Sequence, residues 1–269
     1  MPKDDVIELV EKIAASRKYR SLYPKTIERV VNDCLVKYPK TEVEKKARNL
    51  LHQIWGAYYS RRPDFKKLLE RFESDIKNNK SVKESVLPIL NLQSSTKERI
   101  PILEDFYSRI FSITGTPKII IDSACGLNPL TFFWMQLPED SKYYGFDIDK
   151  EQVDFLNSLF CFLGNKQVEI KLGDVLADKF DYADVILMLK LLPSLEQQKK
   201  GAGLKVIEEQ RCRYLVISYP LRSISGKQKG MTDFYTNQFY SLIKTKPWRV
   251  EKLLFATELV FVVEKQYKN

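Results

Sequence analysis

The pattern of apolar residues changes once along this chain, close to residue 115, and this change constrains the fold more than any other feature. From Lys118 onward, short β-branched runs alternate with helical stretches or long connections. The runs cover residues 118–122, 143–147, 168–172, 183–189, 214–219, 250–255 and 258–264. Alternating strands and helices predict a parallel sheet covered by helices on both faces. The last two runs are nearly adjacent, so we expect an antiparallel hairpin at the end.

The first part of the chain is predicted to be helical. Apolar residues recur there at helical spacing, as in the third stripe from Val43 to Tyr58. Residues 74–85 are polar and read as a linker, and residues 96–113 are helical again. We therefore expect a basic helical domain at 1–80, connecting helices at 81–116 and a ligand-binding α/β domain at 117–269. A mostly parallel, seven-stranded sheet with a terminal hairpin is the Rossmann-like class I methyltransferase fold rather than the dehydrogenase fold.

The positive charge is concentrated at one end of the chain. The net charge is +9, and residues 1–80 contain 19 Lys and Arg against 12 Asp and Glu. This region therefore carries +7 of the excess. Such asymmetry predicts attraction to a polyanion, with RNA, DNA and an anionic membrane as candidates. A solvated helical surface without a partner is the alternative.

Other classes of protein fit the composition poorly. No apolar run approaches about 18 residues, so no membrane span is expected, and the N-terminus lacks the apolar core of a secretion signal. The four cysteines are widely spaced and the only histidine is His52, which argues against a metal site. We expect a soluble cytoplasmic protein with reduced, mostly buried thiols.

The strongest local signals stand at the ends of the first three predicted strands. The segment Ile119–Leu130, IIIDSACGLNPL, is an apolar strand that enters a turn of small residues, where a backbone can approach a ligand closely. Asp147 ends the second strand, 21 residues after Gly126, where its carboxylate could accept hydrogen bonds from both ribose hydroxyls of a nucleoside. Asp174 follows the third strand and could accept a hydrogen bond from an adenine amino group.

Each signal alone is weak, because an Asp after a strand is more often a helix cap. Together, in order along the chain, they are moderately specific for an adenosine-containing cofactor at the carboxyl ends of the strands. The chain has no GxGxxG segment, which argues against a dinucleotide. S-adenosylmethionine has no phosphate to be cradled, so a looser loop suffices.

Five segments of this chain resemble the aminoglycoside-resistance ribosomal RNA methyltransferases that modify N7 of guanine 1405 in the decoding site of 16S rRNA. They span most of the sequence: HQIWGAYY at 52–59, QSSTKER at 93–99, DSACGLNPL at 122–130, LKLLPSLEQQ at 189–198 and ISYPLRSISGKQKGM at 217–231. The resemblance implies a helical N-terminal region that docks on the ribosome and a C-terminal methyltransferase domain. It also implies S-adenosylmethionine as cofactor and S-adenosylhomocysteine as product.

Two residues depart from the family pattern. Ala124 stands where the family usually has the first glycine of the cofactor loop, and Ala adopts a positive φ only at a cost. Gln93 stands where close members have histidine. Both departures indicate a divergent member, in which cofactor affinity could be lower.

The residues and the resemblance together give a set of candidate site residues. Arg99 resembles the family arginine that holds the cofactor carboxylate, with Thr96 and Glu98 positioning it. The candidate cofactor-binding residues are Thr96, Arg99, Asp122, Ala124, Gly126, Asn128, Pro129, Asp147, Ile148, Asp174, Val175 and Leu189. Lys190 and Tyr219 end the fourth and fifth strands, where target bases enter this fold, and are candidates for positioning the base, with Tyr219 either stacking on it or packing at the rim. The candidate RNA-binding residues are Arg48, Arg61, Arg62, Lys66, Lys67, Arg71, Arg222, Lys227 and Lys229.

The chemistry implied is displacement at a sulfonium methyl by guanine N7. That nitrogen carries a lone pair and no proton, so no general base is needed, and the rate should come from orientation. The family favours 16S rRNA in the assembled 30S subunit as the substrate. Nothing in the sequence suggests an obligate dimer, so we expect a monomer. Three alternatives stay open: a catalytically impaired ribosome-binding protein, a methyltransferase for another RNA base and a small-molecule methyltransferase.

Overall fold

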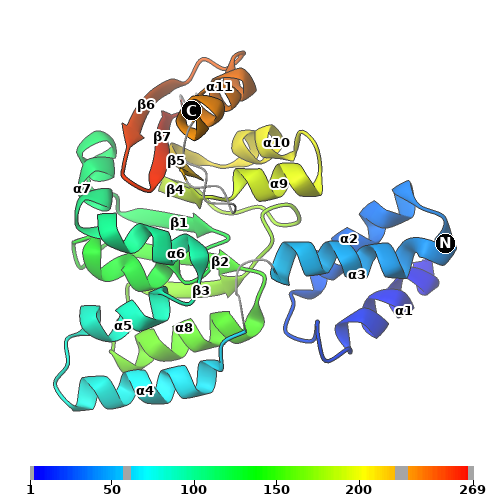
Figure 1. Cartoon of the computed structure of the whole chain (residues 1–269), viewed down its shortest axis with the longest axis horizontal. Coiled ribbons are helices and arrows are strands. Elements are labelled where there is room, and N and C mark those ends of the chain that lie inside the picture. The colour runs from blue at the N-terminus through cyan, green and yellow to red at the C-terminus, as the bar shows by residue number, and fades with distance from the viewer. Residues whose placement is uncertain (1–2, 57–61, 222–229, 266–269) are drawn as a thin grey trace.

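The structure is a computed structural model, and it describes residues 3–56, 62–221 and 230–265. A sheet of seven strands forms the centre of the larger part (Figure 1). The strands are β1 (Ile119–Ser123), β2 (Lys142–Asp147), β3 (Val168–Leu172), β4 (Ala183–Leu189), β5 (Cys212–Pro220), β6 (Arg249–Leu254) and β7 (Glu258–Glu264). Their order is β3-β2-β1-β4-β5-β7-β6. β1 to β5 pair in parallel, and β7 is antiparallel to both β5 and β6. The predicted Rossmann-like methyltransferase fold and its terminal hairpin are confirmed.

Helices precede the sheet and connect its strands. They are α1 (Lys3–Ala14), α2 (Pro24–Lys37), α3 (Lys40–Gly56), α4 (Phe65–Lys77), α5 (Val82–Leu90), α6 (Ser94–Arg99), α7 (Leu103–Thr114), α8 (Lys150–Phe162), α9 (Leu192–Gln198), α10 (Ala202–Glu209) and α11 (Met231–Ile243), with 3-10 turns η1 (Ile100–Ile102) and η2 (Asn128–Trp134). None of the described helices is long and apolar enough to cross a membrane.

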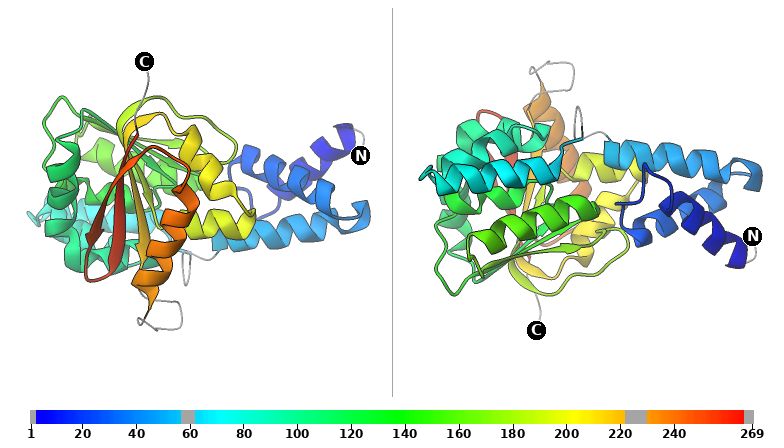
Figure 2. Two further views of the ribbon diagram at one scale, coloured as in Figure 1. Left: turned by 90° about the horizontal axis from the view of Figure 1, so that it is seen from above. Right: turned by 90° about the horizontal axis from the view of Figure 1, so that it is seen from below.

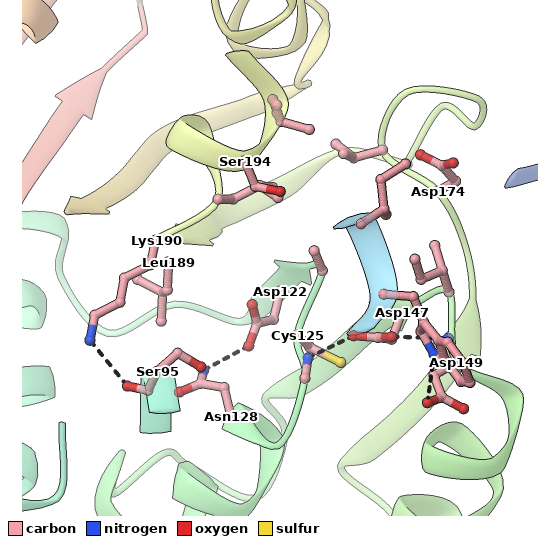
Figure 3. Close-up of a pocket in the computed structure, with 18 of the residues that line it drawn as sticks. Ser95, Asp122, Cys125, Asn128, Asp147, Asp149, Asp174, Leu189, Lys190 and Ser194 are labelled. Atoms are coloured by element: carbon pink, nitrogen blue, oxygen red, sulfur yellow. Dashed lines mark hydrogen bonds between the residues drawn. The ribbon is translucent and has the colours of Figure 1, made fainter. Parts of the chain in front are cut away.

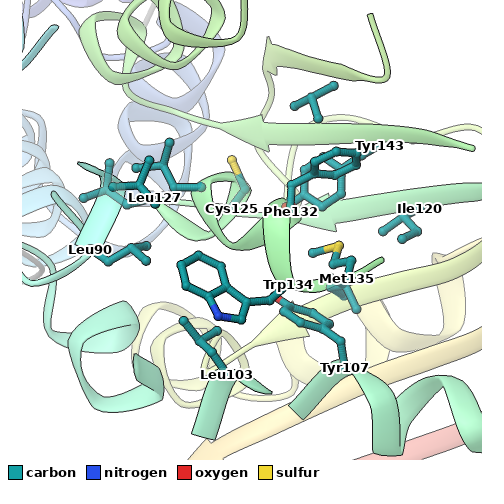
Figure 4. Close-up of a cluster of buried hydrophobic side chains, with 14 of the residues drawn as sticks. Leu90, Leu103, Tyr107, Ile120, Cys125, Leu127, Phe132, Trp134, Met135 and Tyr143 are labelled. Atoms are coloured by element: carbon teal, nitrogen blue, oxygen red, sulfur yellow. The ribbon is translucent and has the colours of Figure 1, made fainter. Parts of the chain in front are cut away.

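Alternation of side chains along the strands builds one hydrophobic core on each face of the sheet. On β1, Ile120 enters the first core and Ile121 the second. The first core packs α5, α7, α8 and η2 against the sheet, and Figure 4 shows part of it around Trp134 and Tyr143. The second core includes apolar residues of α9, α10 and α11. The central strands β1, β4 and β5 are thus buried on both faces, as expected for parallel strands.

The N-terminal helices α1, α2 and α3 form a smaller unit with its own core (Figures 1 and 2). Ile27, Val30 and Val31 of α2 are fully buried in it, against Val43, Ala47 and Leu51 of α3. We call α1–α3 the N-terminal bundle.

Within the expected N-terminal domain of residues 1–80, α4 packs on α8 of the methyltransferase domain. Asp64 caps α4 by accepting a hydrogen bond from the Lys67 backbone N–H at 3.2 Å. Phe65 and Phe72 then contact rings of α8, with centroids 5.2 Å from Phe155 and 6.2 Å from Phe162. Polarity alone also suggested a linker at 74–85, but only residues 78–81 connect α4 to α5. The capping box between Ser81 and Glu84 starts α5 there.

Candidate functional site

The loop after β1 is held in an unusual backbone conformation. Ala124 and Gly126 have φ values of +57° and +53°. Gly126 lies so close to Gln93 that an added Cβ would stand 2.5 Å from the Gln93 Oε1 atom. The same Oε1 accepts a hydrogen bond from the buried Leu127 N–H at 2.7 Å. Gln93, which departs from the family pattern, therefore holds the backbone of the loop after β1 in place.

Asp147, at the end of β2, closes the other side of this loop. Its Oδ2 accepts a hydrogen bond from the Gly126 N–H at 2.8 Å, and its Oδ1 accepts one from the Asp149 N–H at 3.0 Å. Burial raises the pKa of Asp147 to about 6, and the negative charge of Asp149 adds to the rise, although the backbone donors oppose it. The carboxylate lies on the wall of the main pocket (Figure 3).

Asp122 lines the pocket and belongs to a cluster of buried polar side chains that are hydrogen-bonded to one another. Its Oδ2 accepts hydrogen bonds from Asn128 Nδ2 at 2.7 Å and from the Tyr143 hydroxyl at 2.5 Å. Burial raises the pKa of Asp122 to about 6, against the effect of these two donors. Asn128 in turn accepts a hydrogen bond from Arg99 Nη1 at 2.7 Å. The cluster orients the first residue of η2 and the arginine together.

Arg99 and Lys190 share one fully buried carboxylate. Arg99 Nε lies 2.9 Å from Glu258 Oε1, and Lys190 Nζ lies 3.2 Å from the same oxygen. Lys190 Nζ also donates to Glu98 Oε2 at 2.6 Å and to the Ser95 carbonyl at 3.2 Å. Burial alone would raise the pKa of Glu258, but the charges of Arg99 and Lys190 outweigh it and keep that pKa below its ordinary value. Glu258 stays ionised and holds both cations at the edge of the pocket.

The main pocket lies at the carboxyl ends of β1, β2, β3 and β4 (Figure 3). The predicted cofactor residues that line it are Arg99, Asp122, Ala124, Gly126, Asn128, Asp147, Ile148, Asp174, Val175 and Leu189. Lys190, predicted to position the base, lines it as well. Parallel strands end at one edge of the sheet, which is why residues so far apart in sequence meet here.

Thr96, Pro129 and Tyr219 are not part of the pocket wall. The Thr96 hydroxyl donates to the carbonyls of Leu90 and Gln93, so it shapes the start of α6. Pro129 sits in the first turn of η2, as its fixed φ favours. Tyr219 is 2% exposed and stacks on Tyr235 with centroids 4.7 Å apart. The expected place of Tyr219 at the base-entry rim is corrected to the second core, because β5 turns this side chain toward α11.

Several residues that line the pocket were not among the candidate cofactor-binding residues, and three of them come from the N-terminal bundle. These are Arg29 of α2 and Ile54 and Trp55 of α3. The others include Gln93, Ser95, Cys125, Asp149, Gln152, Ser194, Leu195 and Gln198. Asp149 is two positions beyond Asp147, the last residue of β2, and is the N-cap of α8, so its place could have been anticipated. Nothing in the local sequence of α2 signals that Arg29 reaches this pocket.

The candidate RNA-binding residues are of three kinds: those paired with an acidic side chain, those exposed on α4 and those outside the described residues. Arg62, whose side chain is 32% exposed, is paired by hydrogen bonds to both oxygens of Asp149, at 2.7 and 2.9 Å, and lies over the Trp55 ring. Arg48 donates to Glu44 Oε1 at 3.0 Å. Lys66, Lys67 and Arg71 are exposed on α4. The remaining four, Arg61, Arg222, Lys227 and Lys229, lie outside the described residues.

Two further expectations concern single residue types. Cys34, Cys125 and Cys212 are buried as expected, whereas Cys161 is exposed. His52 is exposed on α3. Within residues 3–56, 62–221 and 230–265, no cluster of three or more His, Cys, Asp and Glu side chains could hold a metal ion.

Comparison with known proteins identifies the family. The sequence model of a family described as ribosomal RNA methyltransferase (FmrO) matches residues 15–262. A 16S rRNA (guanine(1405)-N(7))-methyltransferase of Proteus mirabilis is 35% identical over 96% of each chain, and one of Micromonospora echinospora is 32% identical over 98% of each.

Solved structures agree with these relatives. The 16S rRNA methyltransferase RmtF, solved in complex with S-adenosyl-L-homocysteine, matches with a TM-score of 0.81 and 28% identity, over 99% of this chain and 100% of RmtF. The 16S rRNA methylase RmtB matches with a TM-score of 0.77 and 26% identity, over 97% of this chain and 98% of RmtB. On its sequence, fold and pocket, this chain belongs to the ribosomal RNA methyltransferase (FmrO) family.

Proposed function

We propose that this enzyme transfers a methyl group from S-adenosylmethionine to N7 of guanine 1405 in 16S rRNA, with the assembled 30S subunit as substrate, and thereby gives aminoglycoside resistance. We further propose that it acts as a monomer in the cytoplasm. The observation that carries the proposal is the pocket at the strand ends, in which Asp147, Asp174 and Arg99 stand around one cavity in a chain of this family.

The chain's own residues fit the proposed cofactor. Asp147 presents carboxylate oxygens for the ribose hydroxyls, and Asp174 presents one for the adenine amino group. Ile148 and Val175 supply apolar surface beside them. Arg99, oriented by Glu258 and Asn128, faces the pocket with a guanidinium suited to a carboxylate. When bound, the cofactor supplies an electrophilic sulfonium methyl.

For the methyl transfer, the protein needs only to orient the base. Guanine N7 has a free lone pair, so no residue must remove a proton, and rate comes from a short, aligned approach of about 3 Å. Lys190 directly follows β4 with φ +56° and is fixed by Glu98, Glu258 and the Ser95 carbonyl. We propose that this rigid ammonium positions the base from the rim of the pocket.

Contacts to rRNA phosphates are assigned to the exposed basic residues of α4. Lys66 and Lys67 have side chains that are 87% and 81% exposed, and their acidic partners on α4 are 3.9 Å or more away. Such weakly paired cations are free to contact phosphate. Arg61, Arg222, Lys227 and Lys229 remain candidates on sequence grounds alone.

The test is methyl transfer from radiolabelled S-adenosylmethionine to purified 30S subunits, followed by chemical cleavage at N7-methylguanine. One cleavage at guanine 1405 is expected, and Asp147→Ala is the matched inactive control. Incorporation at another base would refute the target and keep the reaction. Expression in a susceptible bacterium should also raise the inhibitory concentration of an aminoglycoside that binds the decoding site.

One observation favours a second candidate, a ribosome-binding protein with impaired catalysis. Ala124 has the positive φ that the family's glycine adopts without cost, so the cofactor loop is strained. Calorimetry with S-adenosylhomocysteine separates the two functions. No cofactor binding, together with normal affinity for 30S subunits, would favour this second candidate.

The small-molecule alternative cannot be tested by deleting residues 1–80. That deletion would remove α4 from the methyltransferase domain, and Arg29, Ile54 and Trp55 from the pocket wall. Direct methyl transfer to RNA-free extracts of small molecules is the appropriate assay.

A further inference from the structure

Arg29 of the N-terminal bundle reaches across to the methyltransferase domain and binds a carboxylate of the cofactor pocket. Its Nε donates to Asp174 Oδ2 at 3.0 Å, and its Nη2 donates to Gln198 Oε1 at 3.2 Å. The side chains of Arg29 and Asp174 are only 14% and 5% exposed. This is a shielded ion pair, and the arginine joins the end of β3 to α9 from outside the domain.

A second set of contacts joins the bundle to the end of β2. Trp55 Nε1 donates to Asp149 Oδ2 at 3.0 Å. The backbone N–H of Tyr23 donates to the Ile148 carbonyl at 2.8 Å, and that of Lys150 donates to the Ser21 carbonyl at 2.7 Å. The bundle is therefore fastened at both strand ends that carry the proposed adenosine-binding carboxylates, and its Arg29, Ile54 and Trp55 side chains line the pocket.

Asp174 depends on Arg29 for its orientation. Its Oδ1 accepts a hydrogen bond from the Leu176 N–H at 2.9 Å, while Oδ2 faces Arg29. Without the guanidinium, a carboxylate that is almost fully buried would lack its cationic partner. Such a group must move, gain water or take up a proton, since an unpaired buried charge is costly.

We infer that Arg29 is a positioning residue for the cofactor, and that it couples cofactor binding to the placement of the N-terminal bundle. The inference rests on the proposed function, because it takes Asp174 as a ligand of the adenosine moiety. Any cofactor that uses Asp174 in this orientation favours the docked bundle. By reciprocity, a bundle held in place by the ribosomal subunit favours cofactor binding by the same factor.

The chain offers a matched control on the same helix. Lys25 Nζ donates to Asp178 Oδ1 at 2.8 Å, so it also joins α2 to the segment after β3. Its side chain is 58% exposed, and it does not line the pocket. Lys25→Ala removes one positive charge and one contact between the same two segments, while Asp174 keeps its partner.

The first experiment measures S-adenosylhomocysteine binding by calorimetry. Arg29→Ala is expected to weaken binding by about 5- to 150-fold, the usual range of coupling between sites. Arg29→Lys keeps the charge but cannot reach Asp174 and Gln198 together, so an intermediate loss is expected. Lys25→Ala should change the dissociation constant less than twofold. Thermal melting shows whether each variant is folded, and if Arg29→Ala is not, Arg29→Lys is compared with Lys25→Arg.

The second experiment measures the affinity for 30S subunits with and without S-adenosylhomocysteine. In the unaltered chain the cofactor product should tighten subunit binding, and Arg29→Ala should remove this tightening. Arg29 variants that bind the cofactor as well as the Lys25 variants do would overturn the inference and leave the proposed function intact. Failure of the unaltered chain to bind S-adenosylhomocysteine would instead refute the proposed function, and the inference with it.

Discussion

Replacing Gly126 by Ala probes the packing that shapes the cofactor loop. An Ala at φ +53° costs about 1–2 kcal/mol of backbone strain, and a gain of about 0.4–1 kcal/mol from the less flexible unfolded chain offsets part of it. The new Cβ would also stand 2.5 Å from Gln93 Oε1 and 2.6 Å from Nε2. The Gln93 side chain can swing away, but it then leaves the buried Leu127 N–H unpaired.

The magnitude follows from these terms. Losing the Gln93–Leu127 hydrogen bond costs about 1–3 kcal/mol, because the donor stays buried. Together with the backbone term, Gly126→Ala should lower the free energy of unfolding by about 1.5–4 kcal/mol. Gly115→Ala is the matched control, since Gly115 has φ +73° but no atom within 4 Å of an added Cβ. It should cost only the backbone term, about 0.5–1 kcal/mol.

A double-mutant cycle separates strain from contact. In a Gln93→Ala background the hydrogen bond is already absent, so Gly126→Ala should cost no more than Gly115→Ala does. The double variant should therefore be more stable than the sum of the single effects by about 1–3 kcal/mol, as measured by urea unfolding followed by circular dichroism. Single effects that add to within about 0.5 kcal/mol would refute the assigned role of Gln93.

Three other predictions test the site. Ala124→Gly removes the backbone strain at φ +57° and should raise the free energy of unfolding by up to about 1 kcal/mol. It should not weaken S-adenosylhomocysteine binding. A lower free energy of unfolding would show that Ala124 is not strained. The pKa of Asp147 is about 6, and the ribose hydroxyls of the cofactor favour its ionised form. The affinity for the cofactor should therefore rise about tenfold from pH 5 to pH 7. An equally steep rise for Asp147→Asn would show that Asp147 is not its cause. Changing both Lys66 and Lys67 to Gln should reduce, by about 2, the magnitude of the slope of the log binding constant for 30S subunits against log salt concentration. The matched control, Lys252→Gln on β6, should leave this slope unchanged. An unaltered slope in the double variant would show that α4 is not part of the interface.

The direction of the pH effect on cofactor affinity follows from the pKa of Asp147 in the protein without cofactor. Burial raises the pKa of Asp147 from its usual value, so between about pH 4 and pH 6 the folded chain carries more protons than the unfolded one. This contribution to stability is lost as the pH rises through 6. A ligand that hydrogen-bonds to the ionised carboxylate releases that proton on binding, so its affinity rises over the same range.

The sheet and most of the pocket could be predicted from the order of residues along the chain. The β-branched runs at 183–189 and 258–264 coincide with β4 and β7, because a strand buried on both faces needs a continuous apolar run. The run at 168–172 coincides with β3, an edge strand whose buried and exposed residues alternate. The residues at the strand ends followed as well, since parallel strands bring their carboxyl ends to one edge. Asp122, Asp147 and Asp174 could therefore be placed in one site without coordinates.

The division of the N-terminal helices and the residues that complete the pocket depend on long-range packing and could not be predicted. The amphipathic pattern of α4 shows that one face is buried, but not that Phe65 and Phe72 pack on α8 rather than on α3. Charge counting likewise grouped Arg62 with Lys66 and Lys67, although the first is paired with Asp149 and the others are exposed. Local sequence carries periodicity and composition, whereas the partner of a long basic side chain depends on which carboxylate the fold brings within reach. For Arg29 that carboxylate is Asp174, 145 positions away along the chain.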